Sequence, residues 1–146
     1  MQNKLLASIL ITNYNKEKFL KKTIISCLKQ NYKRKEIIFF DDKSNDNSIK
    51  IIQKYKKVFL IKNNNKKYLS GPLNQINGIL ETFKKSKGNY LFLLDSDDRF
   101  KTNKISNIIK IFKNNKEIKF IQDTAKMNKK NIIKIKRKKH FFSIWP

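Results

Sequence analysis

The feature that most constrains this chain is an apolar run that ends in acidic residues. Residues 91–94 read Leu-Phe-Leu-Leu, and Asp95, Asp97 and Asp98 follow within four positions. Because no polar residue interrupts the run, it predicts a strand buried on both faces, as in a parallel sheet. Three carboxylates this close repel one another unless a cation or hydrogen-bond donors lie among them. The stretch therefore predicts a cation site at a strand end, where open α/β sheets bind ligands.

Similar apolar runs alternate with helical patterns along the whole chain. Strands are predicted at 5–11, 36–40, 58–61, 91–94 and 118–121, with a half-exposed edge strand at 132–136. Apolar residues at helical spacing predict helices over 16–30, from about 48 to 55, over 71–88 and over 101–115. This order predicts an α/β fold with an open, mostly parallel sheet and right-handed crossovers. We expect one domain over residues 1–146, cut at its C-terminal end inside a larger structure.

Polar residues follow two other predicted strands. Thr12, Tyr14 and Asn15 form a polar turn after the first strand, and Asp41 and Asp42 follow the strand at 36–40. The acidic pair can serve a ligand, or it can be a turn that leads to a helix cap. In the second case Ser44 or Asp46 would cap the helix that begins near residue 48.

The chain is strongly basic, with 35 Lys and Arg residues against 11 Asp and Glu and a net charge of +24. Such a charge favours a nucleic-acid-binding domain or a membrane-surface binder that uses the basic residues 126–139. A coding bias toward Lys, Ile and Asn explains the same charge, and Arg occurs only at 34, 99 and 137. We expect no specific nucleic-acid partner.

Cys27 is the one cysteine, so the chain cannot form an internal disulfide. Its apolar neighbours indicate a buried small side chain rather than a reactive thiol. No run of residues reaches the length and apolarity of a membrane helix, and we expect a cytoplasmic protein.

Four blocks of sequence together are far more specific than any of them alone. They cover residues 8–15 (SILITNYN), 26–30 (SCLKQ), 36–46 (EIIFFDDKSND) and 88–98 (GNYLFLLDSDD). In order and spacing, these blocks resemble the family 2 glycosyltransferases, which have the GT-A fold. The resemblance spans residues 8–98 and implies the N-terminal, donor-binding part of such an enzyme.

The resemblance implies a site for a nucleotide-sugar donor, with UDP as the expected nucleotide. The residues that would form it are Thr12, Tyr14, Asn15, Asp42, Asp95 and Asp97. Thr12 and Tyr14 would hold the base and Asp42 would accept a hydrogen bond from it. Asp95 and Asp97 would meet the ribose and a divalent metal, Mn or Mg, with Asp97 and Asp98 as metal ligands.

The resemblance also implies an inverting transfer to a saccharide or lipid-linked acceptor in polysaccharide or glycolipid synthesis, with peripheral contact at the inner face of the membrane. Two residues depart from the family pattern. Thr12 stands where many relatives have Pro, and Lys43 stands where Gly is usual. The D-x-D of this chain is Asp95-Ser96-Asp97. Relatives carry the catalytic base well beyond the D-x-D, so we expect it to be absent from this chain and do not assign it to Asp123.

Overall fold

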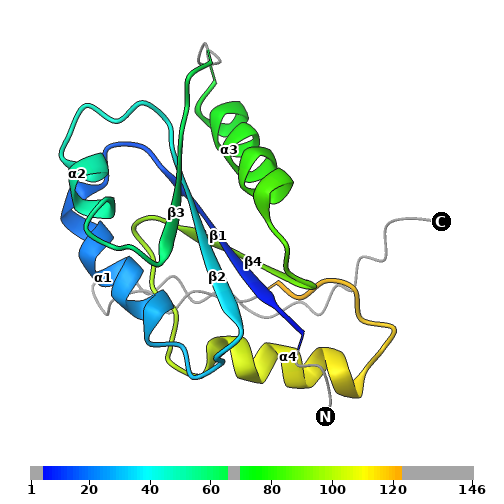
Figure 1. The fold of residues 1–146 in the computed structure, drawn as a ribbon. Coiled ribbons are helices and arrows are strands. Elements are labelled where there is room, and N and C mark those ends of the chain that lie inside the picture. The colour runs from blue at the N-terminus through cyan, green and yellow to red at the C-terminus, as the bar shows by residue number, and fades with distance from the viewer. Residues whose placement is uncertain (1–4, 66–69, 123–146) are drawn as a thin grey trace, which may run out of the picture.

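The computed structural model describes residues 5–65 and 70–122 (Figure 1). Strands and helices alternate in the predicted order. The strands are β1 (Ala7–Asn13), β2 (Lys35–Asp41), β3 (Val58–Lys62) and β4 (Tyr90–Asp95). The helices are α1 (Glu17–Leu28), α2 (Ser48–Ile52), α3 (Gly71–Lys85) and α4 (Lys104–Asn114).

The described strands form one parallel sheet in the order β3-β2-β1-β4. The chain runs outward from β1 through β2 to β3, and then returns to the other side of β1 to form β4. This reversal makes the carboxyl end of β1 the switch point at which open α/β sheets bind ligands. The predicted open parallel sheet with flanking helices is confirmed.

Helices cover both faces of the sheet, and side-chain alternation decides which residues each face receives. Ile9 and Ile11 of β1 join the main core with side chains of α1 and α4. Thr12 and Phe40 point to the opposite face, where α3 packs so closely that Gly78 lies against both. Cys27 is fully buried in the main core, and its burial raises the pKa of the thiol to about 12. The interpretation of Cys27 as a buried small side chain is thus confirmed.

The prediction that residues 91–94 are buried on both faces is wrong. Phe92 and Leu94 are 7% exposed and join the main core, but Leu91 and Leu93 are 43% and 54% exposed. The difference arises because β4 is the last strand of the described sheet, and α3 packs over β1 and β2. An edge strand can therefore lack polar alternation and still expose one face.

The predicted strand at 118–121 is also wrong, because residues 118–122 have no regular secondary structure. Phe120 is 76% exposed, so this apolar stretch does not pack into the described core. The predicted edge strand at 132–136, the basic residues 126–139 and Asp123 lie outside the described residues.

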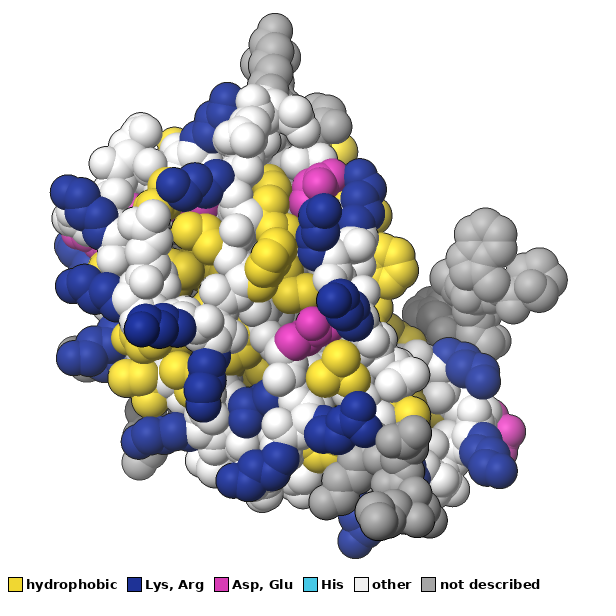
Figure 2. Space-filling view, in the orientation of Figure 1, with side chains coloured by type: hydrophobic (Ala, Val, Ile, Leu, Met, Phe, Trp, Pro, Cys, Tyr) yellow, Lys and Arg dark blue, Asp and Glu magenta, His cyan; other side chains and the backbone are white. Residues whose placement is uncertain are grey.

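The surface carries lysine and arginine side chains in many places, with apolar side chains between them, over the face shown in Figure 2. The basic charge is therefore spread across several elements of this face. Within residues 5–65 and 70–122, no helix is both long enough and apolar enough to cross a membrane.

Candidate functional site

A cleft of about 380 Å³ lies at the carboxyl edge of the sheet. The register brings the strand ends together there, because Asn13 pairs with Asp41 and Thr12 pairs with Asp95. A volume of this size is within the range of small-molecule sites. The residues that line the cleft are Thr12, Asn13, Tyr14, Lys16, Phe40, Asp42, Gly71, Asn74, Gln75, Asp95, Ser96 and Asp97.

Hydrogen bonds join the loop after β1 to the loop after β2. The Asn13 amide donates to Asp41 Oδ1 at 2.9 Å and to the Ser44 hydroxyl oxygen at 3.0 Å. The Ser44 hydroxyl oxygen also accepts from the Asn15 backbone N–H at 3.0 Å, and Asn15 Oδ1 accepts from the Asn45 N–H at 2.7 Å. These bonds satisfy polar groups of both loops within the protein, so the two loops hold each other in place.

Asn15 and Lys43 turn these loops with left-handed backbone angles, at φ values of 52° and 56°. Asparagine adopts this conformation more readily than lysine. Lys43 occupies the position where relatives were expected to have glycine, and the positive φ supplies the physical reason for that preference.

The two neighbouring aspartates at the end of β2 have different roles, one in a turn and one in the cleft. Asp41 is fully buried and accepts hydrogen bonds from the Ser44 N–H and hydroxyl, so it forms the turn. Asp42 lines the cleft and accepts from Asn63 Nδ2 at 2.6 Å. Asp41 therefore stabilises the turn, whereas Asp42 lies in the cleft.

The cap residue of the next helix is Asn47, although its side chain makes no capping bond. Asp46 supplies the acceptor for this end of α2: its carboxylate accepts from the Ser48 N–H and from the Glu17 N–H, both at 2.9 Å. Glu17 in turn accepts from the Asn47 N–H at 2.7 Å. The first turns of α1 and α2 are thus tied together by two carboxylates.

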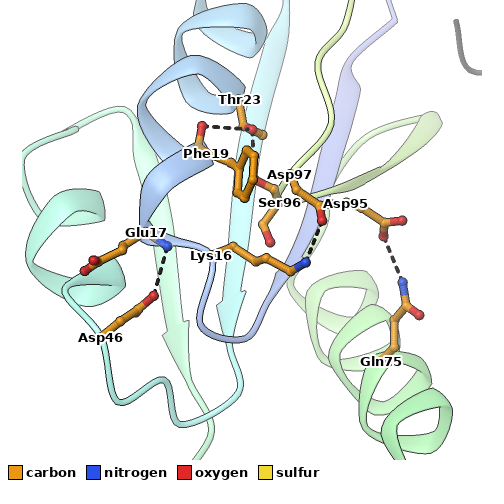
Figure 3. Close-up of polar contacts among 9 residues, drawn as sticks. All are labelled: Lys16, Glu17, Phe19, Thr23, Asp46, Gln75, Asp95, Ser96 and Asp97. Atoms are coloured by element: carbon orange, nitrogen blue, oxygen red, sulfur yellow. Dashed lines mark hydrogen bonds and ion pairs between the residues drawn. The ribbon is translucent and has the colours of Figure 1, made fainter. Parts of the chain in front are cut away.

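The two carboxylates of the D-x-D have different partners (Figure 3). Asp95 Oδ1 accepts from Gln75 Nε2 of α3 at 2.8 Å, whereas Asp97 Oδ2 forms an ion pair with Lys16 Nζ at 2.7 Å. Burial, together with the negative charges of Asp97 and Asp98, raises the pKa of Asp95. The site therefore disfavours a further negative charge and would favour a cation.

The loop that carries the D-x-D is anchored to α1. The Thr23 hydroxyl donates to the Ser96 carbonyl at 2.8 Å, as Figure 3 shows. Further along, Gln30 Nε2 donates to the Lys101 carbonyl at 2.8 Å, and Gln30 Oε1 accepts from the Ile105 N–H at 3.1 Å. The position of the acidic loop is thus set by a helix from another part of the sequence.

The cleft brings together most of the residues predicted for the site. Thr12, Tyr14, Asp42, Asp95 and Asp97 all line it. Two predicted residues are absent from the lining. The Asn15 side chain bonds to the neighbouring loop, and Asp98 lies outside the cleft, its N–H donating to the Asp95 carbonyl at 3.0 Å.

Sequence reasoning missed Lys16 and Gln75, which contact the two carboxylates of the D-x-D directly. Lys16 is one of many lysines and carries no signal of its own beyond its place after the polar turn. Gln75 lies near the start of α3, four residues after Gly71. The predicted start of this helix was a signal for Gln75, because the first turns of the helix lie close to the strand ends.

The donor set of the D-x-D suits a hard cation only in part. Within residues 5–65 and 70–122, no group of three or more His, Cys, Asp or Glu side chains is arranged to hold a metal ion. Asp95 and Asp97 nevertheless place two carboxylates in one cleft, and the Lys16 ammonium shows that a positive charge fits beside Asp97. Magnesium is commonly held by one or two carboxylates, with phosphates and water as its other ligands.

Comparison with known proteins supplies the family. Residues 8–144 match the sequence model described as Glycosyl transferase family 2. The Escherichia coli protein WfaP, a UDP-Glc:alpha-D-GlcNAc-diphosphoundecaprenol beta-1,3-glucosyltransferase, is 42% identical over 106 residues, which are 71% of this chain and 40% of WfaP. This chain thus spans about 40% of the length of that relative.

Solved structures with low sequence identity share the fold. S. aureus TarS 1–349 in complex with UDP-GlcNAc matches with a TM-score of 0.64 at 20% identity, over 75% of this chain and 32% of TarS. The mannosyltransferase PcManGT from Pyrobaculum calidifontis, in complex with GDP-Man and Mn²⁺, matches with a TM-score of 0.62 at 13% identity, over 76% of this chain and 33% of PcManGT. The resemblance seen in the four sequence blocks is confirmed, and the chain belongs to glycosyltransferase family 2.

Proposed function

We propose that the cleft binds the nucleotide-sugar donor of a glycosyl transfer. The observation that carries this proposal is the convergence of Tyr14, Asp42, Asp95 and Asp97 in one cleft at the switch point of a family 2 domain. An aromatic ring, a hydrogen-bond acceptor and two further carboxylates in one cleft suit a ligand that has a base at one end and a diphosphate at the other.

The base end of the donor would lie against the loops after β1 and β2. Tyr14 is 48% exposed and lines the cleft, so its ring can stack on a base, which is worth about 1–3 kcal/mol by analogy with single-stranded nucleic acids. Asp42 can accept a hydrogen bond from a base N–H, and Thr12 also lines the cleft. Asn15 would act through the loop it holds.

The diphosphate end would lie at the D-x-D, where we propose a divalent metal, Mn or Mg. Asp97 and Asp95 would hold the ion, with Asp98 beside them. When bound, the ion would neutralise charge on the departing nucleoside diphosphate. The Mn²⁺ in the PcManGT complex supports this assignment at the level of the shared fold.

The names of the relatives support a proposal for the donor and the acceptor. WfaP uses UDP-Glc and a diphosphoundecaprenol-linked acceptor, and TarS binds UDP-GlcNAc. We therefore propose a UDP-sugar donor and a saccharide or lipid-linked acceptor, in the synthesis of a cell-envelope polysaccharide or glycolipid. A lipid-linked acceptor would place the protein in the cytoplasm with peripheral contact at the inner face of the membrane.

Residues 1–146 would be the donor-binding part of a longer enzyme, because this chain spans about 40% of WfaP. The acceptor surface, and the base that deprotonates the acceptor hydroxyl in an inverting transfer, would then come from further chain. We propose no specific nucleic-acid partner, because the basic side chains are spread over the face shown in Figure 2.

The test is a titration of the chain with UDP, with and without Mn²⁺, in wild type and Asp97→Asn. The variant should lose the Mn²⁺-dependent part of UDP binding and keep its fold, because Asp97 lies on an exposed loop at a strand end. Glu81→Gln is the matched control, since it also removes the carboxylate of an exposed 2.7 Å lysine pair, but on α3 outside the cleft. Equal Mn²⁺-dependent affinity in Asp97→Asn and wild type would refute the proposed cation site.

A further inference from the structure

The ion pair between Lys16 and Asp97 crosses the cleft and joins two loops that are 81 positions apart in sequence. Both side chains remain accessible, at 42% and 36% exposure, and both line the cleft. An exposed pair of this kind contributes little to folding, because solvent screens it and ordering a lysine side chain costs entropy. Stability therefore does not explain why a lysine lies at this position in the cleft.

A cation at the site would affect the partners of Asp95 and Asp97 differently. The Gln75 amide that bonds to Asp95 is neutral, so it can remain in place beside a cation. The Lys16 ammonium is 2.7 Å from Asp97 Oδ2 and would be repelled by a divalent ion that used the same oxygen. Of the two partners, only Lys16 would have to leave.

A lysine that leaves Asp97 has a second acceptor within the same cleft when a donor is present. Its ammonium offers three donors on a flexible four-carbon stem and binds phosphate as a point charge. Lys16 is next to Asn15, whose position is fixed by hydrogen bonds to Ser44 and Asn45, so the backbone stays in place while the side chain moves. Within this cleft, the Lys16 side chain can therefore contact either the Asp97 carboxylate or a bound diphosphate.

We propose that Lys16 is a positioning residue that exchanges partners during donor binding. Without donor, Lys16 pairs with Asp97; when the divalent cation and a nucleoside diphosphate bind, Lys16 leaves Asp97 and contacts the diphosphate. This inference rests on the proposed donor site. It adds a phosphate-binding residue from the loop after β1, and it makes cation binding and diphosphate binding mutually favourable.

The exchange predicts effects of opposite sign when the lysine charge is removed. In Lys16→Gln, Mn²⁺ alone should bind about two- to fivefold more tightly, because the competing exposed ion pair is gone. UDP in the presence of saturating Mn²⁺ should bind about tenfold more weakly, because a charge-assisted hydrogen bond to phosphate is lost. Uridine, which has no phosphate, should bind equally to variant and wild type.

The experiment measures Mn²⁺ affinity by electron paramagnetic resonance, and UDP and uridine affinity by calorimetry, on the full 146-residue chain. Lys84→Gln is the matched control, because Lys84 also forms a 2.7 Å pair with a carboxylate but lies near the far end of α3. That variant makes the same change in net charge and should leave all three affinities unchanged.

Tighter Mn²⁺ binding with weaker UDP binding in Lys16→Gln, and no change in Lys84→Gln, would support the exchange. Unchanged UDP affinity in Lys16→Gln would overturn it, since Lys16 would then only compete with the metal. Weaker Mn²⁺ binding in Lys16→Gln would also overturn it, since Lys16 would then support the site rather than compete for it. A wild-type chain without Mn²⁺-dependent UDP binding would instead remove the proposed donor site itself.

Discussion

Gly78 is the position where α3 comes closest to the sheet, and Gly78→Ala tests how far the cleft depends on that approach. A Cβ atom at Gly78 would lie 2.8 Å from Phe40 Cδ1 and 2.9 Å from Thr12 Cγ2. Ordinary contacts of a Cβ begin at 3.4 Å, so the helix and the sheet would have to separate by about 0.6 Å. Phe40 is 1% exposed, but it also lines the cleft, so a displaced ring would intrude on the site.

The expected stability change is the difference between two effects. Alanine is favoured over glycine within a helix by about 1 kcal/mol, and overpacking of a close contact costs about 1–3 kcal/mol. We therefore expect Gly78→Ala to lower the free energy of unfolding by up to about 2 kcal/mol, measured by urea unfolding followed by circular dichroism. Gly71→Ala is the stability control, because a Cβ at Gly71 has no atom within 4 Å.

The separation of α3 from the sheet should also alter the geometry of the cleft. Gln75 lies one turn before Gly78 on α3 and donates to Asp95 at 2.8 Å. A separation of about 0.6 Å would stretch this bond to the limit of hydrogen-bond geometry, so Mn²⁺-dependent UDP binding should also weaken. The reasoning is refuted if Gly78→Ala unfolds at a urea concentration equal to or above that of Gly71→Ala.

Two further predictions concern the loops. Burial raises the pKa of Asp46, but hydrogen bonds from Ser48 and from the Glu17 N–H outweigh it and lower the pKa below the ordinary aspartate value. The ionised form of Asp46 therefore stabilises the fold above the ordinary aspartate pKa, and this stability is lost as the pH falls through the lowered pKa. Asp46→Asn should lower the free energy of unfolding by about 1 kcal/mol at pH 7, and the gap to wild type should close below about pH 4; a gap independent of pH would contradict the assignment. Lys43→Gly should raise the free energy of unfolding by about 0.5–1 kcal/mol, because a left-handed φ of 56° strains any residue with a Cβ; a lower urea midpoint would show that the lysine side chain offsets this strain.

Apolar runs and helical spacing were sufficient to predict the four strands and four helices of the described fold. They failed where a local pattern depends on neighbours that the sequence does not reveal. Leu91 and Leu93 are apolar like Phe92 and Leu94, yet only the second pair meets other core residues, because β4 lies at the edge of the described sheet. Residues 118–121 have strand-like composition but pair with no described strand.

The site residues that could be predicted are those whose side chains lie close to the end of a predicted strand. Asp42, Asp95 and Asp97 lie within three positions of the end of an apolar run, and parallel pairing then brings them to one edge. Lys16 and Gln75 could not be found in this way, because their importance comes from a contact across the cleft rather than from their neighbours in sequence. Asp41 and Asp42 show the same limit, since two adjacent identical residues face different surroundings.

The hydrogen bonds between the loops after β1 and β2 constrain how this site can evolve. Asn13 at the end of β1 and Asn15 just after it bond to Asp41 at the end of β2 and to Ser44 and Asn45 after it. A substitution on either side therefore removes a partner from the other. We expect viable substitutions in these loops to occur in matched pairs. A chimera that takes both loops from a relative should keep its fold, whereas one that takes a single loop should lose it more easily. Donor preference would then be inherited as a two-loop unit.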